Sequence, residues 1–113
     1  MHEMSICESI LGLIRDQAKA QDFSKVKRVC LEIGPLSGVE IEALKFGFDV
    51  VMRDTLADGA RLEIIETAGT AWCMPCGQSV PIGQRFDACP LCGSHQLRVT
   101  GGDELRVKEL EVN

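Results

Sequence analysis

Two copies of one short motif, Cys73-Met74-Pro75-Cys76-Gly77 and Cys89-Pro90-Leu91-Cys92-Gly93, decide how this chain is organised. Two residues between the cysteines let both thiolates of a copy reach one ion, and the glycine lets the backbone turn back. Four thiolates form a closed tetrahedron, which is the structural zinc arrangement because a catalytic zinc keeps one position for water or substrate. The sequence therefore predicts a zinc site that holds shape and performs no chemistry.

The same four cysteines could serve other chemical roles. Two disulfides or a redox Cys-x-x-Cys pair are less consistent with a doubled motif that has no βαβ pattern around it. A rubredoxin-like iron site stays open, and elemental analysis with a visible spectrum would separate it from zinc. Twelve residues lie between Cys76 and Cys89, enough for a short hairpin whose turns come from Gly77, Pro81 and Gly83.

Length and charge limit the classes of protein that fit. A chain of 113 residues buries one modest core, so we expect one compact domain beside a zinc-stabilised segment. The formal charge is −5, and a zinc ion with four thiolates adds −2, which gives about −7. Between Thr70 and Thr100 the charged side chains are only Arg85, Asp87 and Arg98, and no basic stripe is present. Nucleic acid is therefore a disfavoured partner.

The ends and the apolar runs predict no membrane segment. The start of the chain lacks a basic region, and the most apolar run, residues 46–52, is interrupted by Asp49 and is too short to span a bilayer. We expect a soluble cytoplasmic protein. In that reducing compartment Cys7 and Cys30, which lie among apolar residues, are expected to be small buried side chains.

Apolar periodicity outside the cysteine motifs predicts an α+β domain. A helical period runs from Met4 to Gln21, and its start falls within a residue or two of Met4. Glu40 and Glu42 lie in the first turn of a second helix, where they interact favourably with its dipole. The remaining elements are a strand over residues 28–33, the second helix starting at 37–38, a strand over 61–66 and a strand over 104–112. In the last strand the period of two slips at Lys108-Glu109, which predicts a β-bulge.

Glycine-containing segments divide the chain. Ala68-Gly69-Thr70 and Thr100-Gly101-Gly102-Asp103 bracket the cysteine motifs, so we expect a zinc-ribbon domain over residues 68–102 that is free to reorient. It is inserted into a domain of residues 1–67 plus 103–113, which has a three-stranded sheet and two helices.

The first three residues, Met1-His2-Glu3, form a chelator by connectivity. The free amine, the His2 amide nitrogen and the His2 imidazole bind one ion through adjacent rings, and nickel(II) or copper(II) suits such a plane of nitrogens. The fourth donor would be the Glu3 amide, the Glu3 carboxylate or a group from another molecule. Taken alone the pattern is weak, because every chain starts with Met and one histidine is modest evidence for a ligand.

Five motifs occur in this chain in one order: Met1-His2-Glu3, Leu31-Glu32-Ile33-Gly34, Leu36-Ser37-Gly38-Val39, Gly59-Ala60 and the paired cysteine motifs. Together they resemble the HypA/HybF family, the nickel-insertion metallochaperones of NiFe-hydrogenase maturation. The resemblance covers nearly the whole chain. It implies a nickel site at Met1, His2 and Glu3 in an α+β domain and a zinc-ribbon domain bound by Cys73, Cys76, Cys89 and Cys92. It also implies delivery of nickel to the hydrogenase large-subunit precursor with a partner GTPase.

No catalytic set supports an enzyme. A Walker-type Gly-Lys loop is missing, and with only His2 and His95 no Ser-His-Asp or Cys-His set is assembled. His95 lies three residues after Cys92 and is expected to be a surface residue or a neighbour of the zinc ligands. Two other classes stay open: a zinc-ribbon adaptor that binds a protein or nucleic-acid partner without a second metal, and a small redox protein.

Overall fold

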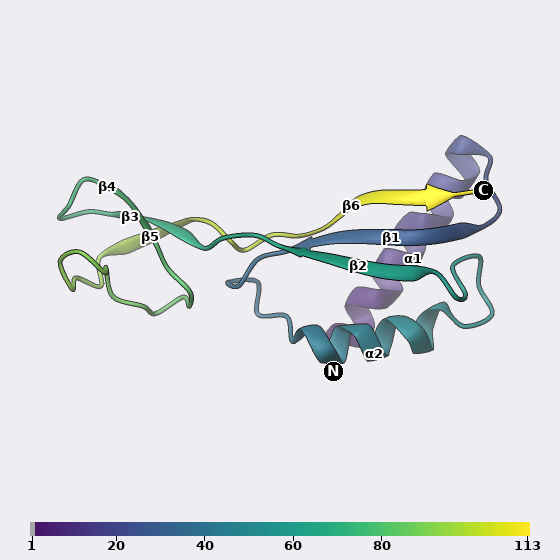
Figure 1. Cartoon of the computed structure of the whole chain (residues 1–113), viewed down its shortest axis with the longest axis horizontal. Coiled ribbons are helices and arrows are strands. Elements are labelled where there is room, and N and C mark those ends of the chain that lie inside the picture. The colour runs from purple at the N-terminus through teal and green to yellow at the C-terminus, as the bar shows by residue number, and fades with distance from the viewer. Residues whose placement is uncertain (1) are drawn as a thin grey trace. The chain divides into compact units, whose positions relative to one another are not determined.

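The computed structural model describes residues 2–113, apart from the side chain of His2. Two helices and six strands follow in the order α1 (His2–Gln21), β1 (Val26–Ile33), α2 (Ile41–Met52), β2 (Arg61–Glu66), β3 (Thr70–Cys73), β4 (Gln78–Pro81), β5 (Leu97–Gly101) and β6 (Leu105–Val112), as Figure 1 shows. The predicted α+β class is confirmed. Within residues 2–113 neither helix is long and apolar enough to cross a membrane.

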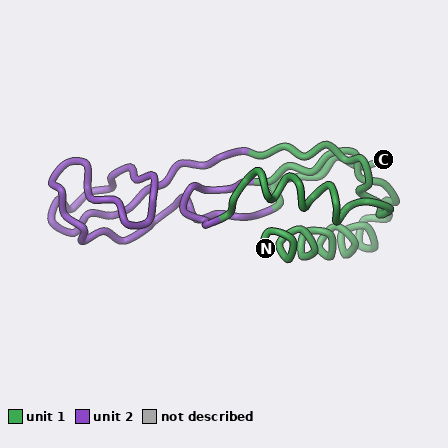
Figure 2. The backbone as a smooth tube through the Cα atoms, turned by 90° about the horizontal axis from the view of Figure 1, so that it is seen from below, with its two compact units in different colours: residues 1–31, 39–64, 107–113 green, residues 32–38, 65–106 purple. Residues whose placement is uncertain are grey.

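The chain forms two compact units, which Figure 2 shows in different colours. Unit 1 contains residues 1–31, 39–64 and 107–113, and unit 2 contains residues 32–38 and 65–106. The ribbon segment of residues 68–102 lies within unit 2. Residues 32–38, which we expected in the first domain, are grouped with the ribbon. Whether the units fold independently stays a prediction.

The first sheet is built around β1, which lies between β2 and β6. Val29, Leu31 and Ile33 alternate along β1 and are almost completely buried, which is the predicted pattern of a strand with one face in the core. The α1 side chains Cys7, Ile10, Leu11 and Ile14 are buried as well, and α2 packs against α1. The apolar stripe of α1 therefore forms the core of unit 1, as its period predicts.

The second helix begins later than we predicted. Ser37 and Gly38 lie outside the helix, after a turn at Pro35 and Leu36, and Gly38 has a left-handed φ of 77°, which no residue of an α-helix adopts. Helix α2 starts at Ile41, and Glu40 is its N-cap, with its side chain accepting a hydrogen bond from the Ala43 N–H. Glu40 thus satisfies a free N–H group of the helix, a more specific role than the dipole interaction we assigned to it.

The predicted change of phase in the alternation of the last strand is seen in the burial of its side chains. Along β6 the less exposed residues are Val107, Leu110 and Val112, so the alternation changes phase between Val107 and Leu110. On the other face, Glu109 and Glu111 both accept hydrogen bonds from the Arg28 guanidinium, at 3.1 and 3.3 Å. This pattern supports the predicted β-bulge.

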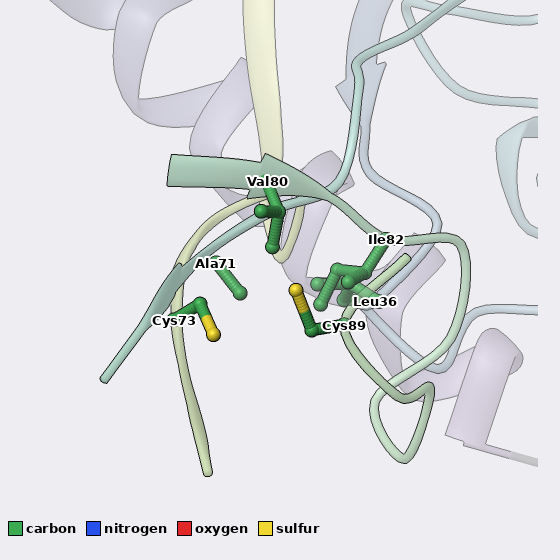
Figure 3. Packing of buried hydrophobic residues seen from close by; sticks show 6 residues of the cluster. All are labelled: Leu36, Ala71, Cys73, Val80, Ile82 and Cys89. Atoms are coloured by element: carbon green, nitrogen blue, oxygen red, sulfur yellow. The ribbon is translucent and has the colours of Figure 1, made fainter. Parts of the chain in front are cut away.

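Unit 2 contains a second antiparallel sheet in which β3 lies between β4 and β5. The buried side chains on one side form a small cluster, shown in Figure 3, in which they point toward one another: Leu36, Ala71, Cys73, Val80, Ile82 and Cys89. Leu36 comes from the segment of residues 32–38, and its carbonyl accepts a hydrogen bond from Arg85 Nε at 3.0 Å. This segment therefore supplies one of the few large side chains of the ribbon core.

Three glycines make close backbone contacts at the base of the ribbon. A Cβ at Gly34 would lie 1.9 Å from the Gly102 carbonyl oxygen, and a Cβ at Gly102 would lie 2.5 Å from the Gly69 Cα. The Leu36 N–H donates to the Gly102 carbonyl at 2.7 Å, which ties the same segments together. We expected Gly69 and Gly102 to provide flexibility, but here glycine is required because the strands approach too closely for a side chain.

This contact predicts a large effect for a small substitution. Gly34→Ala should destabilise the protein by about 2 kcal/mol or more, because the methyl group overlaps backbone atoms that have no room to move. Gly12→Ala is the matched control: it lies on α1 with no atom within 4 Å, and should stabilise by about 0.5–1 kcal/mol. Urea unfolding of both variants measures the difference. Equal stabilities would contradict the close contact.

Candidate metal centres

The four cysteines come from two turns with the same backbone. Cys73 ends β3 and Cys76 lies in the turn that follows it, while Cys89 and Cys92 occupy the second turn. In each copy the glycine N–H donates to the carbonyl of the first cysteine, at 2.8 Å from Gly77 and at 2.8 Å from Gly93. Both glycines have positive φ, 65° and 77°, which only glycine adopts readily. The local reason predicted for these glycines is therefore correct.

The sulfur atoms are placed at the distances that a tetrahedral ion needs. Cys73 and Cys92 Sγ are 3.6 Å apart, Cys76 and Cys89 Sγ are 4.0 Å apart, and all four ligand atoms lie within 4.8 Å of one another. Zinc–sulfur bonds of about 2.3 Å give sulfur–sulfur edges of roughly 3.8 Å in a tetrahedron. The donor set and its spacing fit a tetrathiolate metal ion, and no disulfide joins these residues.

Neighbouring groups shift the pKa values of Cys73, Cys76 and Cys89 in different directions. Burial raises the pKa of Cys73, and the neighbouring thiols of Cys92 and Cys73 together with burial raise that of Cys76 to about 12. Burial also opposes ionisation of Cys89, but the N–H groups of Cys92 and Leu91 outweigh it and lower its pKa to about 7. Without a metal ion the thiols therefore titrate as one coupled group.

The other cysteines behave as the sequence predicts. Cys7 and Cys30 are buried, and the Cys7 thiol donates to the Leu44 carbonyl at 3.6 Å. Burial, followed by the charges of Glu3 and Glu8, raises the pKa of Cys7 to about 11. A thiol that stays protonated is a poor nucleophile and a poor metal ligand.

The amino-terminal chelator lies partly outside the described residues. Met1 and the side chain of His2 are not among them, and His2 is described as the first residue of α1. Glu3 is buried, with 7 % of its surface exposed, and its carboxylate Oε2 accepts a hydrogen bond from the Glu40 N–H at 3.2 Å. The carboxylate of Glu3 is thus directed at the start of α2.

His95 is exposed, and the candidate metal-binding group found among the side chains of residues 3–113 contains the four cysteines and no histidine. The backbone carbonyl of His95 accepts a hydrogen bond from the Leu97 N–H at 2.9 Å. These positions agree with a surface residue beside the cysteine cluster.

Two contacts near the candidate sites were missed from the sequence. Glu40 meets Glu3, and Arg85 meets Leu36, each across more than 35 residues. Glutamate is not among the preferred N-cap residues, so the pattern carried no signal that Glu40 would cap α2 beside Glu3. Arg85 lies in an irregular loop, where no periodicity indicates a partner.

The fold and the cysteine cluster define a small α+β protein that carries a four-cysteine metal site of the zinc-ribbon kind. A family model described as "Hydrogenase/urease nickel incorporation, metallochaperone, hypA" matches residues 1–112. The chain belongs to this HypA family, whose members are metallochaperones and maturation factors.

Individual relatives agree with the family match. The hydrogenase maturation factor HypA of Alkalilimnicola ehrlichii is 61% identical over 113 residues, and both chains are covered completely. The HypA of Azotobacter vinelandii is 62% identical over 112 residues, with 99% of each chain covered. The solution structure of the nickel metallochaperone HypA from Helicobacter pylori superimposes with a TM-score of 0.71 at 26% identity, covering 99% of this chain and 97% of that one.

Proposed function

We propose that this chain binds nickel(II) through Met1, His2 and Glu3 and helps to insert it into the NiFe-hydrogenase large-subunit precursor. A nickel-handling GTPase is the proposed partner, since this chain has no phosphate-binding loop of its own. The proposed location is the cytoplasm. Zinc at Cys73, Cys76, Cys89 and Cys92 is the proposed structural ion, and nickel is the transported cargo. The observation that carries the proposal is the match to the nickel-incorporation family over residues 1–112.

The position of His2 at the start of α1 favours backbone nitrogen atoms as nickel donors. His2 is the first helical residue, and the first N–H groups of a helix have no carbonyl partner within it. The buried Glu3 carboxylate already accepts a hydrogen bond from the Glu40 N–H, a contact that a nickel ion would have to displace. We therefore assign the amine, the His2 amide and the His2 imidazole as donors, and the Glu3 backbone nitrogen as the fourth.

This assignment makes a matched pair of predictions for the two histidines. His2→Ala should lower nickel affinity by about a hundredfold or more, because a donor is lost from the chelate plane. His95→Ala is the control and should leave nickel binding nearly unchanged, since it lies outside the proposed donor set. Equilibrium dialysis of the untagged proteins, with zinc and nickel counted in parallel, measures both. A His2→Ala protein that binds nickel like the wild type would refute the site.

Transfer is tested separately from binding. Nickel-loaded protein should raise the nickel content of the large-subunit precursor when the GTPase and GTP are present. His2→Ala protein should not, although its cysteine cluster is intact. Nickel that moves equally well from free solution would show that binding occurs without a delivery role.

A zinc-ribbon adaptor without a second metal is the other candidate. Exposed apolar side chains on the ribbon favour it: Met74 and Leu91 are each 63% exposed at the tips of the cysteine turns. Such side chains commonly contact a protein partner. The nickel dialysis above separates the two candidates, since an adaptor would bind zinc alone.

A further inference from the structure

Strand β6 leaves one side of the first sheet open. The order β2-β1-β6 places β6 at an edge, and among residues 2–113 no strand of that sheet lies on its outer side. An edge strand presents a row of N–H and C=O groups that another strand can bind. Strand β6 has eight residues, Leu105–Val112, which is longer than the usual strand of about five to six.

A groove runs beside this edge, between α1 and β6. It has a volume of about 460 Å³ and is open to solvent. Its lining is Leu13, Gln17, Gln21, Phe23, Val107, Lys108, Glu109, Leu110 and Val112. Leu13, on the α1 side, is 45% exposed. The edge therefore combines a side without a neighbouring strand of its sheet among residues 2–113 with apolar side chains, the two features of a surface that binds an extended strand.

The sequence of β6 is complementary to itself when read in the opposite direction. Two antiparallel copies placed side by side pair as Leu105 with Val112, Arg106 with Glu111, Val107 with Leu110, and Lys108 with Glu109. Every apolar residue then faces an apolar residue, and every charge faces its opposite. Shifting the register by one residue places Lys108 opposite Lys108, or Glu109 opposite Glu109, and like charges directly opposite destabilise a strand pair.

The slip in β6 makes this register possible in three dimensions. In a strand of regular alternation Val107 and Leu110 would lie on opposite faces, because they are three residues apart. Here both are sheltered on the same face, with Val112, because the alternation changes phase between them. Val107 of one strand can therefore pack against Leu110 of another on the groove side of the sheet.

We infer that β6 is an interface for a second copy of this chain, with the two strands antiparallel around a twofold axis near Lys108 and Glu109. Such an interface is isologous, so each pair of residues occurs twice. The two three-stranded sheets become one sheet of six strands, and Leu13 of each copy lies beside the joined grooves. Charge complementarity along the whole strand favours a second copy over an unrelated extended peptide.

Charge reversal tests this pairing in the full-length, zinc-loaded chain. Lys108→Glu places Glu opposite Glu109, and Glu109→Lys places Lys opposite Lys108, so each variant alone should self-associate at least about tenfold more weakly than the wild type. An equimolar mixture of the two restores both opposite-charge pairs and should form a heterodimer with about the wild-type affinity. Sedimentation velocity over a concentration series measures all three.

Matched controls exclude a general effect of charge. Lys45→Glu and Glu42→Lys make the same changes in net charge at a surface pair on α2, with Nζ and Oε2 3.4 Å apart, and should self-associate like the wild type. Because Glu109 also accepts a hydrogen bond from Arg28, the double variant Lys108→Glu/Glu109→Lys checks for loss of folding and should dimerise. A wild type that stays monomeric at about 1 mM would overturn the inference. So would a Lys108→Glu protein that dimerises normally, or a mixture that does not associate.

Discussion

A two-residue extension before Met1 should abolish the proposed nickel binding and leave zinc content and helix content unchanged. The extension turns the Met1 amine into an amide and moves the free amine away from the His2 imidazole, so the adjacent chelate rings no longer form. The loss should exceed that of any single side-chain change, because the terminal donor is displaced while the cysteine cluster is untouched. We expect an affinity loss of at least about a thousandfold, or about 4 kcal/mol.

The measurement needs chains that differ only at the amino terminus. Untagged protein, protein with two added residues and protein with a carboxyl-terminal extension of the same length are dialysed against nickel, and both metals are counted. The carboxyl-terminal extension is the control and should bind nickel normally. An amino-terminally extended protein with wild-type affinity would place the donors elsewhere, and His95 and the cysteine thiolates would be the first residues to examine.

The second large effect is expected when the cysteine cluster loses its metal. Cys76→Ala should unfold the ribbon, because two of the six residues in its buried cluster, Cys73 and Cys89, also belong to the four-cysteine group proposed to hold zinc. Removing the ion takes away the attraction that holds these thiolates together, and structural zinc contributes on the order of 10 kcal/mol to the folding of small domains. Helices α1 and α2 should persist, because their buried side chains lie in unit 1.

Hydrogen exchange distinguishes local from global unfolding in this variant. Residues 65–106 should exchange rapidly, and residues 32–38 should follow because Leu36 packs in the same cluster. Cys30→Ala is the matched control: it removes a buried thiol outside the cluster and should retain zinc with a stability loss of about 1 kcal/mol. Exchange that increases equally in both helices would show that the two units unfold together.

Local features of the structure were predictable from the sequence. The four cysteines and the glycines after them set the two cysteine turns, because the required φ angles and the short spacing are properties of the chain segment itself. The buried faces of α1 and β1 follow from apolar periods of 3.6 and two. The phase change in β6 could also be read from its apolar residues.

Only the tertiary structure decided which distant segments meet. Leu36 packs in the ribbon core, Gly34 lies against Gly102, and the Glu3 carboxylate meets the N-cap of α2. Each contact joins residues far apart in the chain, and it depends on packing that no single segment specifies. The glycines show the difference most clearly, since in sequence Gly69 and Gly102 look like flexible joints. In the folded chain they are positions where two backbones come too close for any side chain.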